Sequence, residues 1–103
     1  MEIFFHSHNA VISDRMRGRA EHMIHKLADR TKRVVHAVVR FEQDGPVRRG
    51  EVVLNAPGRR SLVAEGTGRY YGPALAQALE RLGAQISHRK RTPKARARQL
   101  QRV

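Results

Sequence analysis

The chain has 103 residues, 40% of them hydrophobic, no cysteine and a formal net charge of +12. This length suits a single domain with a real hydrophobic core, and the lack of cysteine excludes a disulfide scaffold and a thiolate metal site. No apolar run approaches the ~18 residues of a membrane span, and the N-terminal residues lack the features of a signal peptide, so we expect a cytoplasmic protein with no membrane partner.

The positive charge is concentrated towards the C-terminus. Residues 1–80 carry 13 Lys and Arg against 9 Asp and Glu, whereas residues 81–103 carry 8 Lys and Arg and no acid. A tail kept basic for solubility is one explanation, but a polyanionic partner explains the asymmetry better, and in the cytosol that partner is usually a nucleic acid. The five aromatic residues offer little surface for stacking single-stranded bases.

A strand and a helix are the first predicted elements. Residues 2–8 form a short aromatic strand. Ser13 is placed to cap the helix that follows, and Asp14 lies in its first turn, where the helix dipole favours an acid. Apolar side chains then recur at helical spacing as far as about Arg30. The residues of this apolar stripe are Met16, Ala20, Met23, Ile24 and Leu27.

Three strands follow. The β-branched content and the alternation of residues 34–43 predict a strand. Its inward face is expected to carry Val35, Ala37, Val39 and Phe41. Asp44-Gly45-Pro46 is a turn signal, residues 51–56 and 61–65 are two more strands, and glycines 66, 68 and 72 predict a loop.

A second helix and a basic tail complete the chain. Pro73 suits the first turn of a helix, where its missing N–H costs nothing, and apolar residues then repeat at helical spacing to about Arg91. These residues are Leu75, Leu79, Leu82 and Ile86. We expect residues 1–91 to fold as one domain and residues 92–103 to be a tail that is disordered when free.

The predicted order of elements is β-α-β-β-β-α. Two helices that each have a single apolar stripe can both pack on one face of a four-stranded sheet. The expected fold is therefore a two-layer α+β sandwich, which resembles a double-stranded RNA-binding domain preceded by an extra strand.

A basic stripe lies beside the apolar stripe of the first helix. Its residues are Arg15, Arg19, His22, Lys26 and Arg30, with Lys32 and Arg33 just beyond. At about 100° per residue the five helical positions fall within about 80° of one another. An ordinary solvated helix face normally mixes charges of both signs, whereas this stripe contains no acid, although Asp29 borders it. The pattern favours a ridge that contacts a polyanion.

The second helix carries its own basic residues. Arg81 and His88 share a face, and three more cations crowd its last turn, namely Arg89, Lys90 and Arg91. The helix dipole favours cations at that end but does not explain the four Lys and Arg beyond Pro93. Contacts of Lys and Arg with phosphate are salt-sensitive and do not depend on base sequence, so we expect docking on a nucleic-acid backbone.

Metal binding and catalysis have little support in the sequence. His6 and His8 face the same side of a strand, and His22 and His25 are one helical turn apart, but no carboxylate stands at a recognisable ligand spacing. The acids near the turn at Asp44 are more simply the solvent face of a hairpin than a catalytic pair. Gly66-Thr67-Gly68 lacks the final glycine of a phosphate-binding loop. We expect no metal, no cofactor and no enzymatic activity.

Two segments carry a family resemblance: V-I-S-D-R-M-R-G-R-A-E-H-M-I-H-K-L, followed by three strands, and E-R-L-G-A-Q-I-S-H-R-K. The chain resembles the short ribosome hibernation promoting factors and the related ribosome-associated translation inhibitor, protein Y, over roughly residues 1–90. Lys26-Leu27 stands at the family's Lys-Leu, and His88 and Lys90 stand at its basic positions. The family's Asp-x-Tyr before the second helix is replaced by Gly68-Arg69-Tyr70-Tyr71.

The resemblance implies a specific function. Family members bind the small ribosomal subunit in the channel for mRNA and tRNA and contact 16S rRNA through basic residues of both helices. They silence idle ribosomes by occlusion in stationary phase or stress. We therefore expect this partner, no DNA partner, and a monomer off the ribosome.

A generic double-stranded RNA-binding module is the alternative function. Such domains usually carry a lysine cluster at the start of their second helix. The corresponding segment here, Tyr71-Gly72-Pro73-Ala74, contains no lysine. The ribosomal interpretation is therefore favoured.

Overall fold

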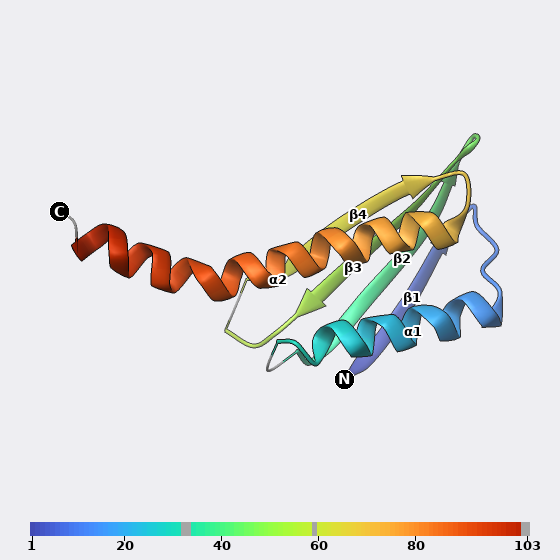
Figure 1. Cartoon of the computed structure of the whole chain (residues 1–103). Coiled ribbons are helices and arrows are strands. Elements are labelled where there is room, and N and C mark those ends of the chain that lie inside the picture. The colour runs from blue at the N-terminus through green and yellow to red at the C-terminus, as the bar shows by residue number, and fades with distance from the viewer. Residues whose placement is uncertain (32–33, 59, 102–103) are drawn as a thin grey trace.

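A computed structural model describes the backbone of residues 1–31, 34–58 and 60–101, and the side chains of these residues as far as His88. The elements follow the predicted β-α-β-β-β-α order (Figure 1). Their bounds are β1 (Glu2–His8), α1 (Asp14–Ala28), β2 (His36–Asp44), β3 (Val47–Asn55), β4 (Leu62–Gly68) and α2 (Tyr71–Gln101).

The four strands form one mixed sheet in the order β1-β2-β3-β4. β1 and β2 are parallel, whereas β2, β3 and β4 are antiparallel neighbours. A parallel pair needs a long crossover connection, and α1 provides it. The β2–β3 hairpin turns through Gly45 and Pro46, and the positive φ of Gly45, 60°, explains why glycine suits this turn.

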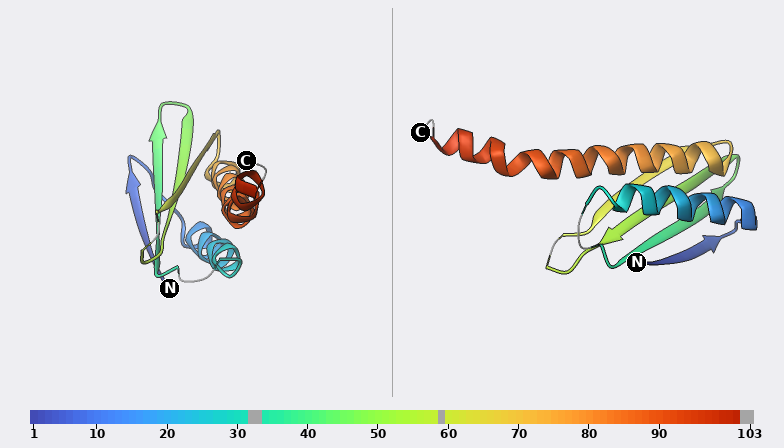
Figure 2. Two further views of the ribbon diagram at one scale, coloured as in Figure 1. Left: turned by 90° about the vertical axis from the view of Figure 1, so that its left-hand side faces the viewer. Right: turned by 60° about the horizontal axis from the view of Figure 1, so that its bottom comes forward.

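Both helices cover the same face of the sheet, as the left view of Figure 2 shows. Between the two layers lies a core of side chains that are almost fully buried: Ala20, Ile24, Ala37, Val39, Phe41, Val52, Leu54, Leu75, Ala78, Leu82 and Ile86. The predicted α+β two-layer sandwich is confirmed. The apolar stripes of the two helices pack against the side chains on the inner face of the sheet, which come from every second residue of each strand.

The predicted loop at Gly66 and Gly68 is wrong, because β4 continues to Gly68. A Cβ on Gly66 would lie 2.1 Å from the carbonyl oxygen of Ala74 and 2.8 Å from the amide nitrogen of Ala78. The first turns of α2 thus lie directly on the backbone of β4. Gly66 meets the need for this close approach and does not interrupt the strand.

The ends of two other elements also differ from expectation. Val35 precedes β2 and is 50% exposed, so it does not belong to the inward face. β3 begins at Val47 instead of residue 51, because the two-residue turn lets the hairpin pair from Asp44 onwards.

The expected end of the second helix near Arg91 is wrong as well, since the helical backbone of α2 continues to Gln101. The residues after Pro93 are mostly Lys, Ala, Arg, Gln and Leu, which are strong helix formers and favour a helix on the C-terminal side of the proline. The right view of Figure 2 shows α2 extending beyond the sheet and beyond α1. The division into a domain of residues 1–91 and a basic tail of residues 92–103 stays a prediction.

Candidate nucleic-acid interface

The two helices run side by side in the same direction. A Cβ on Gly72 of α2 would lie 3.8 Å from the Met16 methyl carbon and 3.8 Å from an Arg19 guanidinium nitrogen. Eleven residues later on each helix, a Cβ on Gly83 would lie 3.5 Å from a Leu27 methyl carbon. The equal offsets show that α1 and α2 lie next to each other over three turns.

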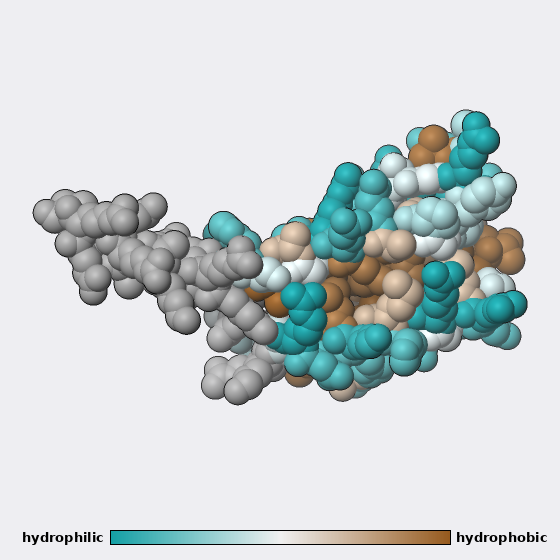
Figure 3. All heavy atoms as spheres, in the orientation of Figure 1, coloured by the Kyte–Doolittle hydropathy of each residue, from teal (hydrophilic) through white to brown (hydrophobic). Residues whose placement is uncertain are grey.

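This pairing creates a shallow groove between α1 and α2. A hollow of about 360 Å³ in it is lined by the apolar side chains of Met23, Leu27 and Leu79 and by the basic side chains of Lys26 and Arg30. Figure 3 looks onto this face and shows apolar groups along the strip between the helices, with hydrophilic side chains on both sides of it. The groove has an apolar floor and a basic rim on α1.

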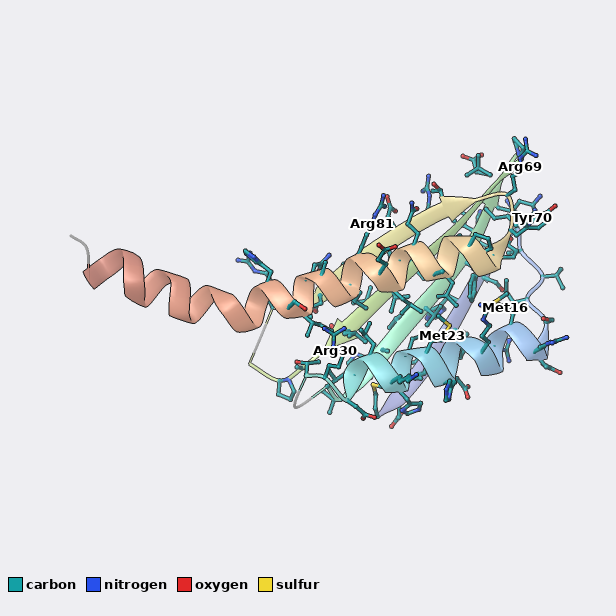
Figure 4. All side chains as sticks on the ribbon, in the orientation of Figure 1. Met16, Met23, Arg30, Arg69, Tyr70 and Arg81 are labelled. Carbon is teal, nitrogen blue, oxygen red and sulfur yellow. The ribbon has the colours of Figure 1, made fainter. Side chains whose placement is uncertain are left out.

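Arg30, two residues after the end of α1, extends across the groove to α2 (Figure 4). One of its guanidinium nitrogens donates a hydrogen bond of 3.0 Å to the Ser87 hydroxyl, and another lies 3.3 Å from the position of a Cβ on Gly83. A larger residue at position 83 would force the guanidinium to move. A guanidinium has five N–H donors, and this one is already held in place when a ligand arrives.

The predicted basic stripe of α1 lies along this groove. Four of its members lie on α1 and the fifth, Arg30, follows two residues after the end of the helix; all five are exposed: Arg15, Arg19, His22, Lys26 and Arg30. Lys26 and Arg30 line the hollow. A guanidinium nitrogen of Arg19 would lie 3.8 Å from a Cβ on Gly72. Arg15 and His22 lie on the same flank of the helix as these residues, because the helical period is 3.6 residues. The structure therefore brings this part of the predicted site together on one rim.

Arg81 lies on the opposite flank of α2, beside β4 (Figure 4). Its guanidinium donates a hydrogen bond of 2.8 Å to the carbonyl oxygen of Glu65. Gln85 donates to the Val63 carbonyl at 2.7 Å in the same way. The fold thus separates Arg81 from the groove, and its contact with RNA stays a prediction. His88, seven residues later, is exposed on the same flank.

A row of hydrogen bonds along the edge strand is a feature that the sequence did not indicate. Gln77 accepts from the Thr67 amide at 2.9 Å, and so completes a set in which residues 77, 81 and 85 of α2 bind residues 67, 65 and 63 of β4. Each step of four residues along α2 corresponds to a step of two residues along β4. The long polar side chains thereby satisfy backbone groups that an edge strand would leave open to another chain.

The remaining predicted residues are only partly covered by the structure. Lys32 and Arg33 lie outside the described residues. Arg89, Lys90 and Arg91 belong to the helical backbone of α2, while their side chains lie outside the described part.

Neither a metal site nor a membrane-spanning helix is found among the residues that the structure describes. No group of three or more His, Cys, Asp or Glu within residues 1–31, 34–58 and 60–101 is arranged to hold a metal ion. In the same ranges, no helix has both the length and the apolar character required to span a bilayer.

The chain is similar to one protein family and to solved structures of proteins with the same fold. The profile of the family described as Sigma 54 modulation protein / S30EA ribosomal protein matches residues 3–94. No curated protein sequence is significantly similar to the chain. Several solved structures share the fold, and two of them are described next.

The first of these structures is a ribosomal subunit interface protein from Coxiella burnetii, with a TM-score of 0.78 and 17% identity over 87% of this chain and 98% of the other. The second is the N-terminal domain of Protein Y from Thermus thermophilus, with a TM-score of 0.73 and 24% identity over 84% of this chain and 96% of the other. At these identities the similarity establishes the fold.

Proposed function

The chain belongs to the family of Sigma 54 modulation protein / S30EA ribosomal proteins, and on that premise we propose that it binds the small ribosomal subunit and inhibits translation. In this proposal the folded domain occupies the channel for mRNA and tRNA and contacts 16S rRNA. It keeps idle ribosomes inactive during stationary phase or stress. It acts by occlusion, without catalysis and without a cofactor.

The groove between α1 and α2 is the proposed RNA-binding surface. The observation that carries this proposal is the guanidinium of Arg30, which Ser87 fixes across the groove next to Lys26. Cations held by a rigid scaffold lose little conformational entropy when they dock on phosphates. Two solved proteins with this fold, one of them a ribosomal subunit interface protein, support a ribosomal partner.

A pair of charge-matched double variants tests the surface. Arg19→Gln with Lys26→Gln removes two cations from the groove, and Arg40→Gln with Arg49→Gln removes two exposed cations from the other face of the sheet. Each phosphate contact contributes about one unit to the slope of log affinity against log salt. We therefore expect the groove variant to lower the slope for 30S binding by about 2 and the sheet variant to leave it nearly unchanged.

Two results would count against the proposal. Equal losses of affinity in both double variants would mean that only the total charge of the chain matters. Competition by naked duplex RNA as effective as that of 30S subunits would favour the generic double-stranded RNA-binding module. In-vitro translation then measures whether inhibition follows 30S affinity across the variants.

A further inference from the structure

A second hollow lies at the end of the groove where both helices begin. It has a volume of about 340 Å³ and is formed by the segment that leads into α1, the first turn of α1, and residues 70–72. Met16 and Gly72 line it, and a Cβ on Gly72 would lie 3.8 Å from the Met16 methyl carbon across the groove. The hollow is therefore continuous with the groove.

Tyr70 is the most exposed aromatic side chain of this hollow. Its side chain is 67% exposed, whereas Tyr71, the other tyrosine of the chain, is mostly buried and packs edge-on against Phe41 with ring centroids 5.4 Å apart. Figure 4 shows Tyr70 and Arg69 together at this end of the molecule. An exposed tyrosine immediately before a helix has no role in the core.

Arg48 fixes Tyr70 relative to the core. Its guanidinium carbon lies 5.4 Å from the ring centroid of Tyr71 and 5.9 Å from that of Tyr70, so it is within cation–π distance of both rings. The same guanidinium donates a hydrogen bond to the carbonyl oxygen of Arg69. A series of contacts thus leads from buried Phe41 through Tyr71 and Arg48 to Tyr70, and the exposed ring is oriented before any ligand binds.

The surroundings of Tyr70 combine positive charge with apolar surface. Arg48 stands beside the ring, Arg69 is exposed and immediately precedes Tyr70 in the chain, and a guanidinium nitrogen of Arg19 lies close to Gly72. Val11, 94% exposed, also lines the hollow. A ligand that matches both has a flat apolar face and a negatively charged group close to it. A nucleotide has this composition.

We propose that Tyr70 stacks on an unpaired base of an RNA strand whose neighbouring nucleotides follow the groove between α1 and α2. Arg48 and Arg69 would meet the phosphates next to that base. The proposal rests on the proposed function in so far as the groove binds RNA. It adds a distinct contact, with single-stranded RNA and through base stacking, at the end of the groove.

A single tryptophan tests the stacking directly, because the chain contains none. In the full-length protein, Tyr70→Trp places a fluorophore at the hollow, and Val63→Trp places one on the uncovered face of the sheet, where Val63 is 46% exposed. Each variant is titrated at low salt with a single-stranded RNA of mixed sequence, long enough to form a stable duplex with its complement, with the same strand annealed to that complement, and with inorganic polyphosphate. Anisotropy of the labelled nucleic acid measures binding in parallel.

We expect the single strand to quench Tyr70→Trp strongly, the duplex and polyphosphate to leave it nearly unchanged, and Val63→Trp to respond to none of the three. Quenching equal at both positions, or binding of the single strand by anisotropy without quenching of Tyr70→Trp, would overturn the proposal. The second result would be expected if this hollow instead received a protein segment.

Binding to 30S subunits separates this proposal from the proposed function. Tyr70→Phe keeps the aromatic face and should bind as the unmodified chain does, whereas Tyr70→Ala should bind roughly 5- to 100-fold more weakly. If the groove variant loses affinity while Tyr70→Ala does not, the stacking contact on the ribosome is refuted and the proposed function stands. If the groove variant binds normally, the proposed function fails, and the fluorescence titration still decides whether Tyr70 stacks on a base.

Discussion

At the level of single residues, one hydrogen bond determines the orientation of the Arg30 guanidinium in the groove. The Ser87 hydroxyl accepts from Arg30 at 3.0 Å across the two helices. Long basic side chains on a helix surface normally sample many rotamers, and ordering each of them on binding costs about 0.5–1.5 kcal/mol. Ser87 removes much of that cost before the proposed RNA ligand is present.

Replacing Ser87 by alanine tests this effect without changing the charge. We expect Ser87→Ala to weaken 30S binding about 2- to 10-fold, which corresponds to the ordering cost of one side chain, and to leave the salt slope unchanged because no cation is lost. Ser87→Thr keeps a hydroxyl and should retain most of the affinity. Wild-type affinity in Ser87→Ala, measured by 30S titration, would show that the orientation of Arg30 does not limit binding.

At the element scale, α2 is seated on the sheet by a close approach and by polar side chains. Its first turns lie on Gly66 of β4, and residues 77, 81 and 85 bind the outer backbone groups of the same strand. The position of α2 sets the width of the groove, since α1 packs against the same sheet. A change beneath α2 should therefore alter stability and the proposed RNA-binding surface together.

Adding one methyl group at Gly66 tests the seating of α2. In Gly66→Ala the Cβ would lie 2.1 Å from a backbone oxygen of α2, which cannot move alone as the end of a side chain can. We expect a loss of about 3 kcal/mol in the free energy of unfolding, measured by urea denaturation. The matched control is Gly18→Ala on the exposed face of α1, where nothing lies within 4 Å. There alanine should stabilise the helix by about 1 kcal/mol, and similar destabilisation in both variants would contradict the role of Gly66.

At the scale of the whole molecule, the charge is distributed along one long axis. Residues 81–103 carry a net charge of +8 out of +12, and α2 carries the backbone of this segment beyond the sheet as far as Gln101. The groove is fixed by the core, whereas the segment after Thr92 extends away from it (Figure 2). We infer that the groove provides the geometry of binding and that the C-terminal segment adds affinity.

Truncation after Thr92 separates these contributions. It removes four cations, Lys94, Arg96, Arg98 and Arg102, and should lower the salt slope of 30S binding by up to about 4. The truncated chain should still inhibit in-vitro translation when its concentration is raised. The opposite pattern, in which the truncated chain is inert at every concentration and a peptide of residues 92–103 inhibits alone, would refute occlusion by the folded domain.

Features that depend on neighbouring residues could be predicted from the amino-acid sequence. Ser13 caps α1 as predicted, with its hydroxyl accepting from the Met16 amide at 3.1 Å, and the period of 3.6 residues located the apolar and basic stripes. The β-α-β-β-β-α order is confirmed, and the resemblance read from two segments is confirmed by the family match over residues 3–94.

Which residues share a surface depends instead on how the elements pack in three dimensions. The parallel alignment of α1 and α2 places Arg30 against Ser87, 57 positions away, and the packing of α2 on β4 gives Arg81 a backbone partner on the far flank. The same packing explains why residue 66 is a glycine, although the sequence suggested that this glycine belongs to a loop. Arg48 joins a hairpin to the segment before α2 and so orients Tyr70. Local periodicity cannot predict such contacts, because they depend on how distant segments pack around a common core.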